Sequence, residues 1–253
     1  LNMAGRCYIS YQMWKLLLIK TILIMGAGNT LSRIDSQIRQ YQNAGLSTPP
    51  SLVDIQGYSV LFKNTINLIQ GQYGSHKSRF AEHLAGILIN NNSRYLTKNG
   101  FIGKEACKVI YVDTERSIKY NLPQTRMRIS NIAGYYCTKT SLHLTSLIRT
   151  SKSNRLVDMV TYIDDISKFT NKHIVIVIDV VSDLVFDFNN QVESSILIGQ
   201  LTSVLNELDC TVVCVIHENP GHINKKARGH LGSELLNKAT NVFKVKEERD
   251  SLC

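Results

Sequence analysis

The sequence predicts an α/β fold in which a twisted, mainly parallel sheet is flanked by helices on both faces. Three observations predict it. Short runs of β-branched residues alternate with segments of helical periodicity, as buried parallel strands and their crossover helices do. Of the 253 residues, 43% are hydrophobic and four are proline, so the chain can bury a large core. A glycine-containing loop, residues 71–78, stands between an apolar run and a helical period.

The expected elements become regular past Pro50. Short apolar runs predict strands at 66–70, 108–113, 142–148, 173–179, 211–216 and 241–245. Apolar residues at helical spacing predict helices at 77–89, 155–169 and 191–208. Residues 90–104 are rich in Asn, Lys and Gly and are expected to form a loop, whereas residues 117–134 are ambiguous.

The amino-terminal part is expected to stand apart from a core at residues 57–253. Residues 14–25 form an apolar run that two lysines interrupt, and spanning a membrane needs about 20 apolar residues, so no span is predicted. Residues 1–24 are expected to be an apolar extension, with Met25 as an alternative start. Residues 25–56 are expected to be a helical lead-in.

Charge and cysteine content bound the function classes. Lys and Arg number 29 against 20 Asp and Glu, and the net charge of +9 favours polyanionic partners without locating them. The six cysteines include no Cys-x-x-Cys pair, which predicts a reduced, cytoplasmic protein without a structural zinc site.

Residues 71–78, GQYGSHKS, have the layout of a phosphate-binding loop. Such a loop wraps phosphate oxygens with backbone N–H groups at a helix N-terminus, while a lysine reaches the β and γ phosphates and a hydroxyl binds Mg²⁺. Gly71, Lys77 and Ser78 stand at the required positions. His76 departs from the pattern, because it replaces the second glycine and must either keep a negative φ or tolerate strain. A polar turn without a ligand is the alternative. The residues expected to bind the nucleotide are Gly71, Gly74, Ser75, His76, Lys77, Ser78 and Arg79.

Two predicted strands end in carboxylates. The run 174–179, IVIVID, ends at Asp179, and the run 108–113 is followed by Thr114 and Glu115. Phosphoryl transfer requires a carboxylate near Mg²⁺ and a group that orients the attacking water. Each acid alone would also suit a solvated turn or a helix cap. Together with the loop, Ser78 and Asp179 are the expected metal-binding residues.

The next predicted strand ends at His217, where a polar side chain could reach the γ-phosphate. Residues 218–238 follow, with Lys225, Lys226 and Arg228 in a glycine-containing loop. These residues are expected to contact DNA phosphates or the nucleotide of a neighbouring subunit. An ordinary solvated loop is the alternative.

Together these motifs resemble RecA-like ATPases, the P-loop NTPases found in plasmid replication helicases of the RepA-like group and in mobilisation and integrative elements. The resemblance covers residues 55–245. It depends on the stretches GQYGSHKSRF, VDTERS, VIDVVSDLVFDFNN and HENPGHINKKARGHLGSELLNK. Relatives often carry a residue other than glycine before the loop lysine. The resemblance implies a RecA-like fold, ATP and Mg²⁺ as cofactors, DNA as a partner, and assembly into a homo-oligomer such as a hexameric ring.

The resemblance also implies roles for single residues. Lys77 would neutralise the β and γ phosphates, and Glu115 would polarise the attacking water. His217 resembles the polar sensor at the end of the next strand. Asp183 and Asp187 match the family too, and we assign them to loop structure or a subunit interface before catalysis. Arg79 would steady the phosphates or pair with an acid.

These expectations define one hypothesis and two alternatives. The hypothesis is an ATPase that acts on DNA, preferentially single-stranded, in replication or mobilisation of a plasmid or mobile element. The first alternative is a nucleotide-gated DNA-binding or assembly protein that does not hydrolyse ATP. The second is a small-molecule kinase, for which no lid arginines are found in the sequence. Relatives continue beyond residue 245, so a truncated copy with reduced stability is also expected.

Overall fold

A computed structural model of the chain describes residues 27–43, 49–91, 100–220 and 226–246. The chain divides into two units, Leu1–Pro49 and Pro50–Cys253. In the first unit the described element is the helix α2 (Ala27–Asn43). The expected lead-in over residues 25–56 therefore contains this helix and the first strand of the second unit, while the expected extension 1–24 lies outside the described residues. No helix within the described ranges is long and apolar enough to cross a membrane.

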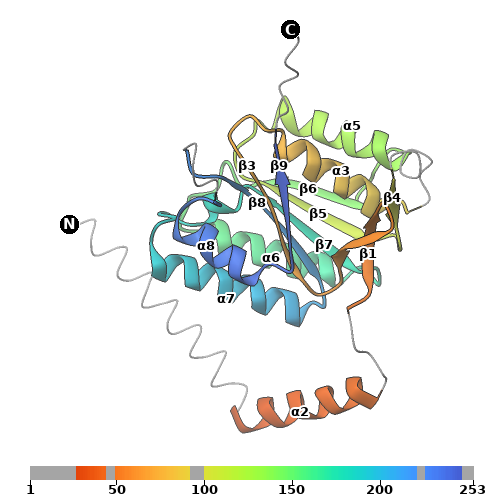
Figure 1. Ribbon diagram of the computed structural model, residues 1–253, viewed down its shortest axis with the longest axis vertical. Helices are drawn as coiled ribbons and strands as arrows, with labels where there is room; N and C mark the ends of the chain where they lie inside the picture. Colours follow the sequence, from red (N-terminus) through yellow and green to blue (C-terminus); the bar gives the residue numbers. More distant parts are fainter. Residues whose placement is uncertain (1–26, 44–48, 92–99, 221–225, 247–253) are drawn as a thin grey trace, which may run out of the picture. The chain divides into compact units, whose positions relative to one another are not determined.

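The second unit is built on a parallel sheet (Figure 1). Among the described residues it contains six strands in the order β6-β5-β7-β8-β3-β9, and every neighbouring pair is parallel. The strands are β3 (Ile66–Gly71), β5 (Lys108–Asp113), β6 (Leu142–Ser146), β7 (Ile174–Asp179), β8 (Thr211–His217) and β9 (Asn241–Val245). The six strands expected from the sequence are confirmed, with ends that differ by at most two residues.

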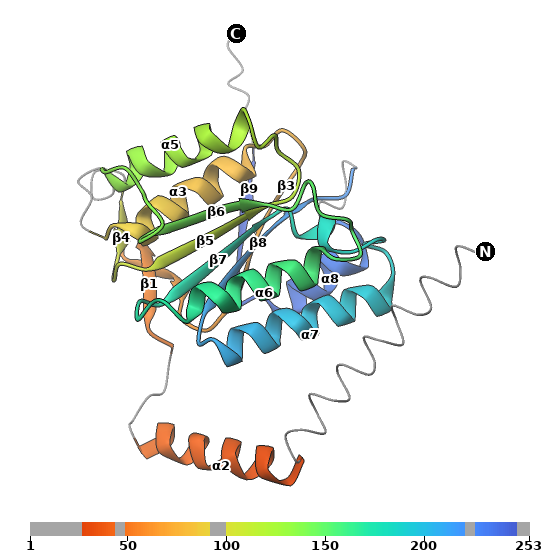
Figure 2. The same ribbon diagram turned by 180° about the vertical axis from the view of Figure 1, so that it is seen from behind.

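Helices cover both faces of this sheet. Figures 1 and 2 show α3 (Lys77–Ile89) and α5 (Asn121–Ala133) on one face, and α6 (Arg155–Ser167), α7 (Gln191–Glu207) and α8 (Gly229–Lys238) on the other. The ambiguous segment 117–134 thus contains a helix. The segment 218–238 was expected to contain a glycine-containing loop with the basic residues, and its second half forms the helix α8, because Leu231 and Leu235 are buried on one helical face.

Alternation along the strands builds the two halves of the core. In β5, Ile110 and Val112 belong to the core cluster that includes residues of α6, α7 and α8, whereas Val109 and Tyr111 belong to the cluster that includes residues of α3 and α5. Successive strand side chains point to opposite faces, so a strand covered on both sides must be apolar throughout. Each large side chain fully buried in this way contributes about 1.5–3 kcal/mol to folding.

A second, antiparallel sheet was not predicted. In the part of the chain that the structure describes it has three strands in the order β2-β1-β4: β1 (Ser51–Ile55), β2 (Tyr58–Phe62) and β4 (Phe101–Gly103). Gln56 and Gly57 join β1 to β2 with φ values of 51° and 85°, the left-handed pair that a tight hairpin requires. The expected loop 90–104 is therefore wrong at its end, where β4 pairs with β1.

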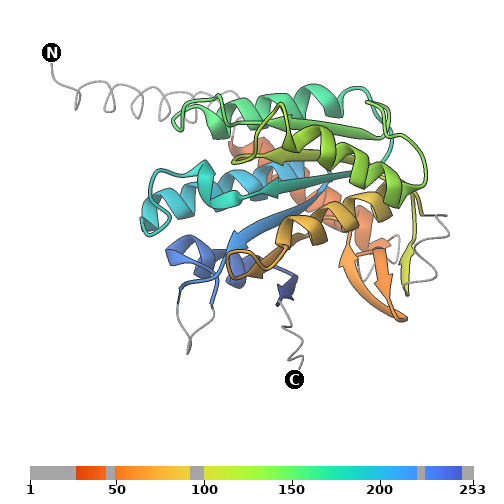
Figure 3. The ribbon, with the colours of Figure 1, turned by 90° about the horizontal axis from the view of Figure 1, so that it is seen from above.

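The register of the parallel sheet brings the predicted site residues to one edge. Gly71 pairs with His217 across β3 and β8, and Asp113 pairs with Asp179 across β5 and β7. These residues end their strands, and the carboxyl ends of parallel strands meet at the same edge, where α/β proteins commonly bind ligands. Figure 3 shows the strands and helices of this unit from above.

Candidate functional site

The loop that follows β3 begins at a glycine with no room for a side chain. A Cβ atom added to Gly71 would lie 2.4 Å from the carbonyl oxygen of Val245 and 2.5 Å from Oγ of Ser75. The first of these contacts is with backbone of the neighbouring strand β9, so it cannot be relieved by a rotamer change. The close approach of the chain therefore requires glycine at this position.

His76 stands where the phosphate-loop pattern has glycine, and its backbone is left-handed. Its φ and ψ are 63° and 28°, and its side chain is exposed and makes no capping hydrogen bond. The loop therefore keeps the conformation that the missing glycine would adopt, and the histidine tolerates it. For a residue with a Cβ atom this costs about 1–2 kcal/mol.

Replacing His76 by Gly is expected to stabilise the protein by about 1 kcal/mol, because the strain disappears and the side chain that is removed is exposed and makes no capping hydrogen bond. The melting temperature should rise by about 2–4 °C, measured by circular dichroism. Gly74→Ala is the matched control. Its φ is 80° and a Cβ atom there meets nothing within 4 Å, so only conformational strain is added and the melting temperature should fall. A lower melting temperature for His76→Gly would contradict the conclusion that the left-handed backbone of His76 is strained.

Lys77 is buried within the loop. Its side chain is 5% exposed, and Nζ donates a hydrogen bond of 2.6 Å to the carbonyl oxygen of Gln72. Burial lowers the pKa of this amine, while Asp179, Glu218 and Glu115 act in the opposite direction. A buried cation of this kind is stabilised by an added anion.

Ser75 supplies an independent sign that the loop holds a polar ligand. Among the described residues its Oγ is buried and has no hydrogen-bond partner. Buried hydroxyls are normally paired, so this one is available to a bound group. With the cation of Lys77 in the same loop, the donors fit a phosphate.

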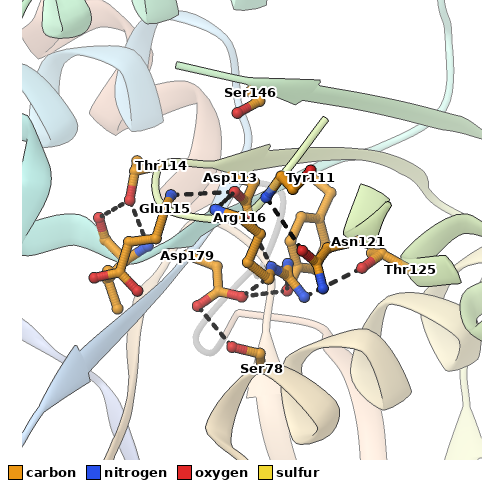
Figure 4. A network of polar contacts seen from close by, with 12 residues as sticks. Ser78, Tyr111, Asp113, Thr114, Glu115, Arg116, Asn121, Thr125, Ser146 and Asp179 are labelled. Atoms are coloured by element: carbon orange, nitrogen blue, oxygen red, sulfur yellow. Dashed lines mark hydrogen bonds and ion pairs between the residues drawn. The ribbon is translucent and has the colours of Figure 1, made fainter. Parts of the chain in front are cut away.

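Ser78 meets Asp179 at the carboxyl edge of the sheet. Ser78 Oγ donates a hydrogen bond of 3.1 Å to Oδ1 of Asp179, and the hydroxyl of Tyr111 donates one of 2.7 Å to Oδ2 (Figure 4). Burial raises the pKa of Asp179, and Arg116, Tyr111 and Ser78 oppose this. A hydroxyl and a carboxylate oxygen are hard donors, and their pairing fits a Mg²⁺ ion and its water shell.

Glu115 follows β5 on the same edge. Its side chain is exposed, and its backbone N–H donates a hydrogen bond of 3.1 Å to Oδ1 of Asp113. Although the side chain reaches solvent, the surrounding protein removes part of the water around its carboxylate and so raises the pKa of Glu115, and the negative charges of Asp183 and Asp179 add to the shift. A carboxylate with a raised pKa accepts protons more readily and suits a general base. In the view of Figure 4, Glu115 and Arg116 leave the strand end on opposite sides of Asp179.

Arg116 was not predicted to belong to the site. It forms ion pairs with the carboxylates of Asp113, Asp179 and Glu82. Glu82 is 1% exposed on α3 and also pairs with Arg128 of α5 at 2.5 Å. The sequence signal was the acid at position 82 in the buried stripe of a helix, since a charge is rarely buried there unless it is paired.

His217 ends β8 beside the loop. Its ring lies 5.8 Å from the ring of Tyr73, and its Nδ1 is buried without a partner among the described residues. Burial lowers the pKa of His217 to about 4, with smaller contributions from the positive charges of Lys77 and Arg228. The ring is therefore neutral at pH 7 and carries one donor and one acceptor nitrogen.

The lowered pKa of His217 predicts a pH-dependent contribution to stability. Between pH 6.5, the ordinary value, and about pH 4, the unfolded chain binds a proton that the folded ring does not. Stability is therefore lost as the pH falls through this window. In His217→Gln the melting temperature should fall less between pH 7.5 and pH 5 than in the wild type, and the other histidines are shared by both proteins. Parallel melting curves would show that His217 titrates normally.

The segment that follows β8 folds back beside the loop. Glu218 forms a bridge with Ala227, and the backbone N–H of Glu218 donates to the carbonyl oxygen of Gly71 at 2.9 Å. Lys226 and Arg228 are exposed, and the Arg228 guanidinium lies 4.4 Å from the centre of the Phe188 ring. The predicted basic residues 226 and 228 thus lie close to the end of β8, and Lys225 lies outside the described residues.

Other predicted residues make local contacts. Arg79 is exposed and lies 3.7 Å from the carboxylate of Glu82. Asp183, in the short helix η1 (Val181–Leu184), pairs with Arg155 at 3.2 Å. Asp187 accepts a hydrogen bond of 2.8 Å from the backbone of Asn189.

Comparisons with known proteins identify the fold. No protein-family model matches the chain, and a comparison with curated proteins finds no match. Among solved structures, an ATPase domain is similar with a TM-score of 0.56 and 12% identity, over 88% of this chain and 87% of that one. A KaiC-like protein from the hyperthermophilic archaeon Pyrococcus horikoshii OT3 is similar with a TM-score of 0.52 and 15% identity, over 79% and 78%. The chain has the fold of a RecA-like P-loop NTPase.

Proposed function

We propose that the protein binds ATP with Mg²⁺ at the loop 71–78 and hydrolyses it. One observation carries this proposal: Ser78 Oγ lies 3.1 Å from Oδ1 of Asp179, directly beyond the buried Lys77. A phosphate loop and a strand-end carboxylate meet in this way when they share a metal-bound phosphate group. One of the structural neighbours is an ATPase domain, which adds support at the level of the fold.

The proposed roles follow from the positions of the side chains. Lys77 would bind the β and γ phosphates, and Ser75 would donate to a phosphate oxygen. Ser78 would ligate the metal ion, and Asp179 would accept hydrogen bonds from its water shell. When bound, Mg²⁺ supplies neutralisation of the charge on the phosphate oxygens. Glu115 would orient the attacking water and accept its proton.

His217 would report the γ-phosphate to the segment that follows β8. In support, its Nδ1 has no hydrogen-bond partner among the described residues, and its ring lies 5.8 Å from the ring of Tyr73 in the loop. The backbone N–H of Arg228 donates to the carbonyl oxygen of His217 at 2.8 Å. A shift of His217 on phosphate binding would therefore be transmitted to this arginine.

We further propose that the ATPase acts on DNA, preferentially single-stranded, as a homo-oligomer in a plasmid or mobile element. The support is the net charge of +9 and the exposed bases Lys226 and Arg228 beside the site. In an oligomer the same bases could instead stabilise the nucleotide of the next subunit. A nucleotide-gated DNA-binding protein without hydrolysis is the alternative function.

ATP turnover measured with and without single-stranded and duplex DNA tests this proposal. Turnover should rise when DNA is added, and Lys226→Ala and Arg228→Ala should each weaken the rise and reduce its dependence on salt. Lys172→Ala is the matched control, because Lys172 is exposed and precedes β7 at the opposite edge of the sheet. ATP binding without turnover under every condition would leave the nucleotide-gated alternative. If ATP turnover does not change when DNA is added, the proposal that the ATPase acts on DNA is wrong.

A further inference from the structure

Arg116 connects the ends of two strands to α3, the helix that follows the phosphate loop. Its Nε pairs with Oδ2 of Asp113 at the end of β5, and its Nη2 lies 3.1 Å from Oδ2 of Asp179 at the end of β7. Its Nη1 lies 2.8 Å from Oε1 of Glu82 on α3. The side chains of Asp113, Asp179 and Glu82 are 0%, 4% and 1% exposed, and the side chain of Arg116 is 20% exposed. The planar fork of arginine suits such multiple pairing, which a lysine cannot reproduce.

The same contacts hold the turn that carries Glu115. Oδ1 of Asp113 accepts hydrogen bonds from the backbone N–H groups of Glu115, at 3.1 Å, and Arg116, at 2.7 Å. Oδ2 of Asp113 is occupied by the guanidinium. The hydroxyl of Thr114 accepts from the backbone N–H of Val180 at 2.9 Å and so ties this turn to the end of β7. The path from the guanidinium to the Glu115 backbone therefore passes through a single buried carboxylate.

At the end of β7, the two carboxylate oxygens of Asp179 have different partners, and Arg116 contacts one of them. Oδ2 faces the guanidinium and the hydroxyl of Tyr111, whereas Oδ1 faces Ser78, the residue proposed to hold the metal ion. The carboxylate can therefore rotate little, because both of its oxygens are engaged by groups from different elements. Arg116 thus contacts both carboxylate-bearing strand ends that the proposed reaction needs.

We propose that Arg116 is a positioning residue of the ATPase centre, which holds the turn of Glu115 at a fixed place beside the Asp179 carboxylate. This inference rests on the proposed ATPase function. The described partners of Arg116 are protein groups, among them the carboxylates of Asp113, Asp179 and Glu82. It acts through Asp113 on the general base and through Oδ2 on the residue beside the metal ion. Misplacing a catalytic group by about 1 Å can cost about 100-fold in rate.

Arg128 provides a matched control within the same network. Its Nε and Nη2 bond to the carboxylate of Glu82 at 2.5 and 2.7 Å, and Nη2 bonds to Oγ1 of Thr125 at 3.0 Å. No contact of Arg128 with Asp113 or Asp179 is found in the described part of the chain. Removing Arg128 therefore loosens the link between α3 and α5 and leaves the two strand ends connected.

The experiment compares Arg116→Gln, Arg116→Lys and Arg128→Gln with the wild type. For each protein, kcat and KM for ATP hydrolysis, the affinity for a fluorescent ATP analogue with Mg²⁺, and the melting temperature are measured. Arg116→Gln should lower kcat at least about tenfold while KM and affinity stay within about threefold. Arg116→Lys should recover part of this loss, since it restores the charge but not the fork. Arg128→Gln should lower the melting temperature but keep kcat within about threefold.

The possible results separate the two proposals. If Arg116→Gln and Arg128→Gln lower kcat equally for equal losses of melting temperature, Arg116 is merely structural and this inference is overturned while the ATPase proposal stands. If Arg116→Gln does not fold, Arg116→Lys carries the test, and a kcat equal to that of the wild type overturns the inference. If the wild type binds ATP but shows no turnover, the ATPase function fails and the inference fails with it.

Discussion

Glu115→Gln is expected to lower kcat for ATP hydrolysis about 1,000-fold and to leave ATP binding within about threefold of the wild type. The amide keeps the size of the side chain but cannot accept the proton of the attacking water, and a general base contributes about 10²–10⁴-fold. A 1,000-fold loss corresponds to about 4 kcal/mol of transition-state stabilisation. Steady-state turnover and binding of a fluorescent ATP analogue measure the two quantities separately.

Glu105→Gln is the control for the loss of one negative charge. Glu105 pairs with Lys63 at 2.7 Å and precedes β5, at the edge of the sheet opposite the site. Its turnover should equal that of the wild type. If Glu115→Gln also keeps the wild-type kcat, Glu115 is not the base, and the role proposed for it is wrong.

The raised pKa of Glu115 adds a pH dependence to this prediction. The base works in its ionised form, so turnover should fall as the pH drops through its pKa. Partial desolvation of the carboxylate and the nearby carboxylates Asp183 and Asp179 shift that pKa upward, so turnover should begin to fall at a pH above the ordinary titration range of a glutamate. This fall should disappear from the residual activity of Glu115→Gln.

Lys77→Ala is expected to weaken ATP binding about 300-fold, or by about 3.4 kcal/mol. The amine is 5% exposed and its pKa is lowered by burial, so an added phosphate both pairs with the cation and satisfies its remaining donors. Isothermal titration calorimetry with ATP and Mg²⁺ measures the change. In the wild type, saturating ATP should also raise the melting temperature, because a ligand stabilises the state that binds it.

Without ATP, Lys77→Ala should fold as well as the wild type. The lost contact is one hydrogen bond to the loop carbonyl of Gln72, and the cost of burying a cation disappears with it. Lys63→Ala, in front of β3 at the opposite edge of the sheet, is the control and should bind ATP normally. If the Lys77→Ala variant and the wild type bind ATP with equal affinity, the nucleotide does not bind at the loop 71–78.

Much of the fold was predictable from the sequence because the central strands are buried on both faces. A strand such as IVIVID has to be apolar at every position, and this makes it visible without its neighbours. The hairpin of β1 and β2 was missed although Gln56-Gly57 stands between alternating apolar residues, a short-range hairpin signal. Strand β4 spans only Phe101–Gly103 and carries too few residues for a period to show.

The candidate site divides in the same way. The loop residues, Ser78 among them, are recognisable because their spacing is local, and Asp179 because it ends a buried strand. Arg116 itself carried no such local signal, although its partner Glu82 was visible as an acid in the buried stripe of a helix. Its partners Glu82 and Asp179 lie 34 and 63 positions away in the chain, and their pairing depends on how α3 and β7 pack beside β5.

The sequence by itself determined the α/β class, the six strands of the parallel sheet and the glycine-containing loop 71–78 before a helix, since each follows from interactions between residues close in the chain or from burial of whole segments. Only the tertiary structure decided the strand order, the left-handed backbone of His76 and the cluster around Arg116. The physical reason is that a charge becomes buried and paired only when distant elements exclude water from it, and the packing of those elements is a property of the whole unit.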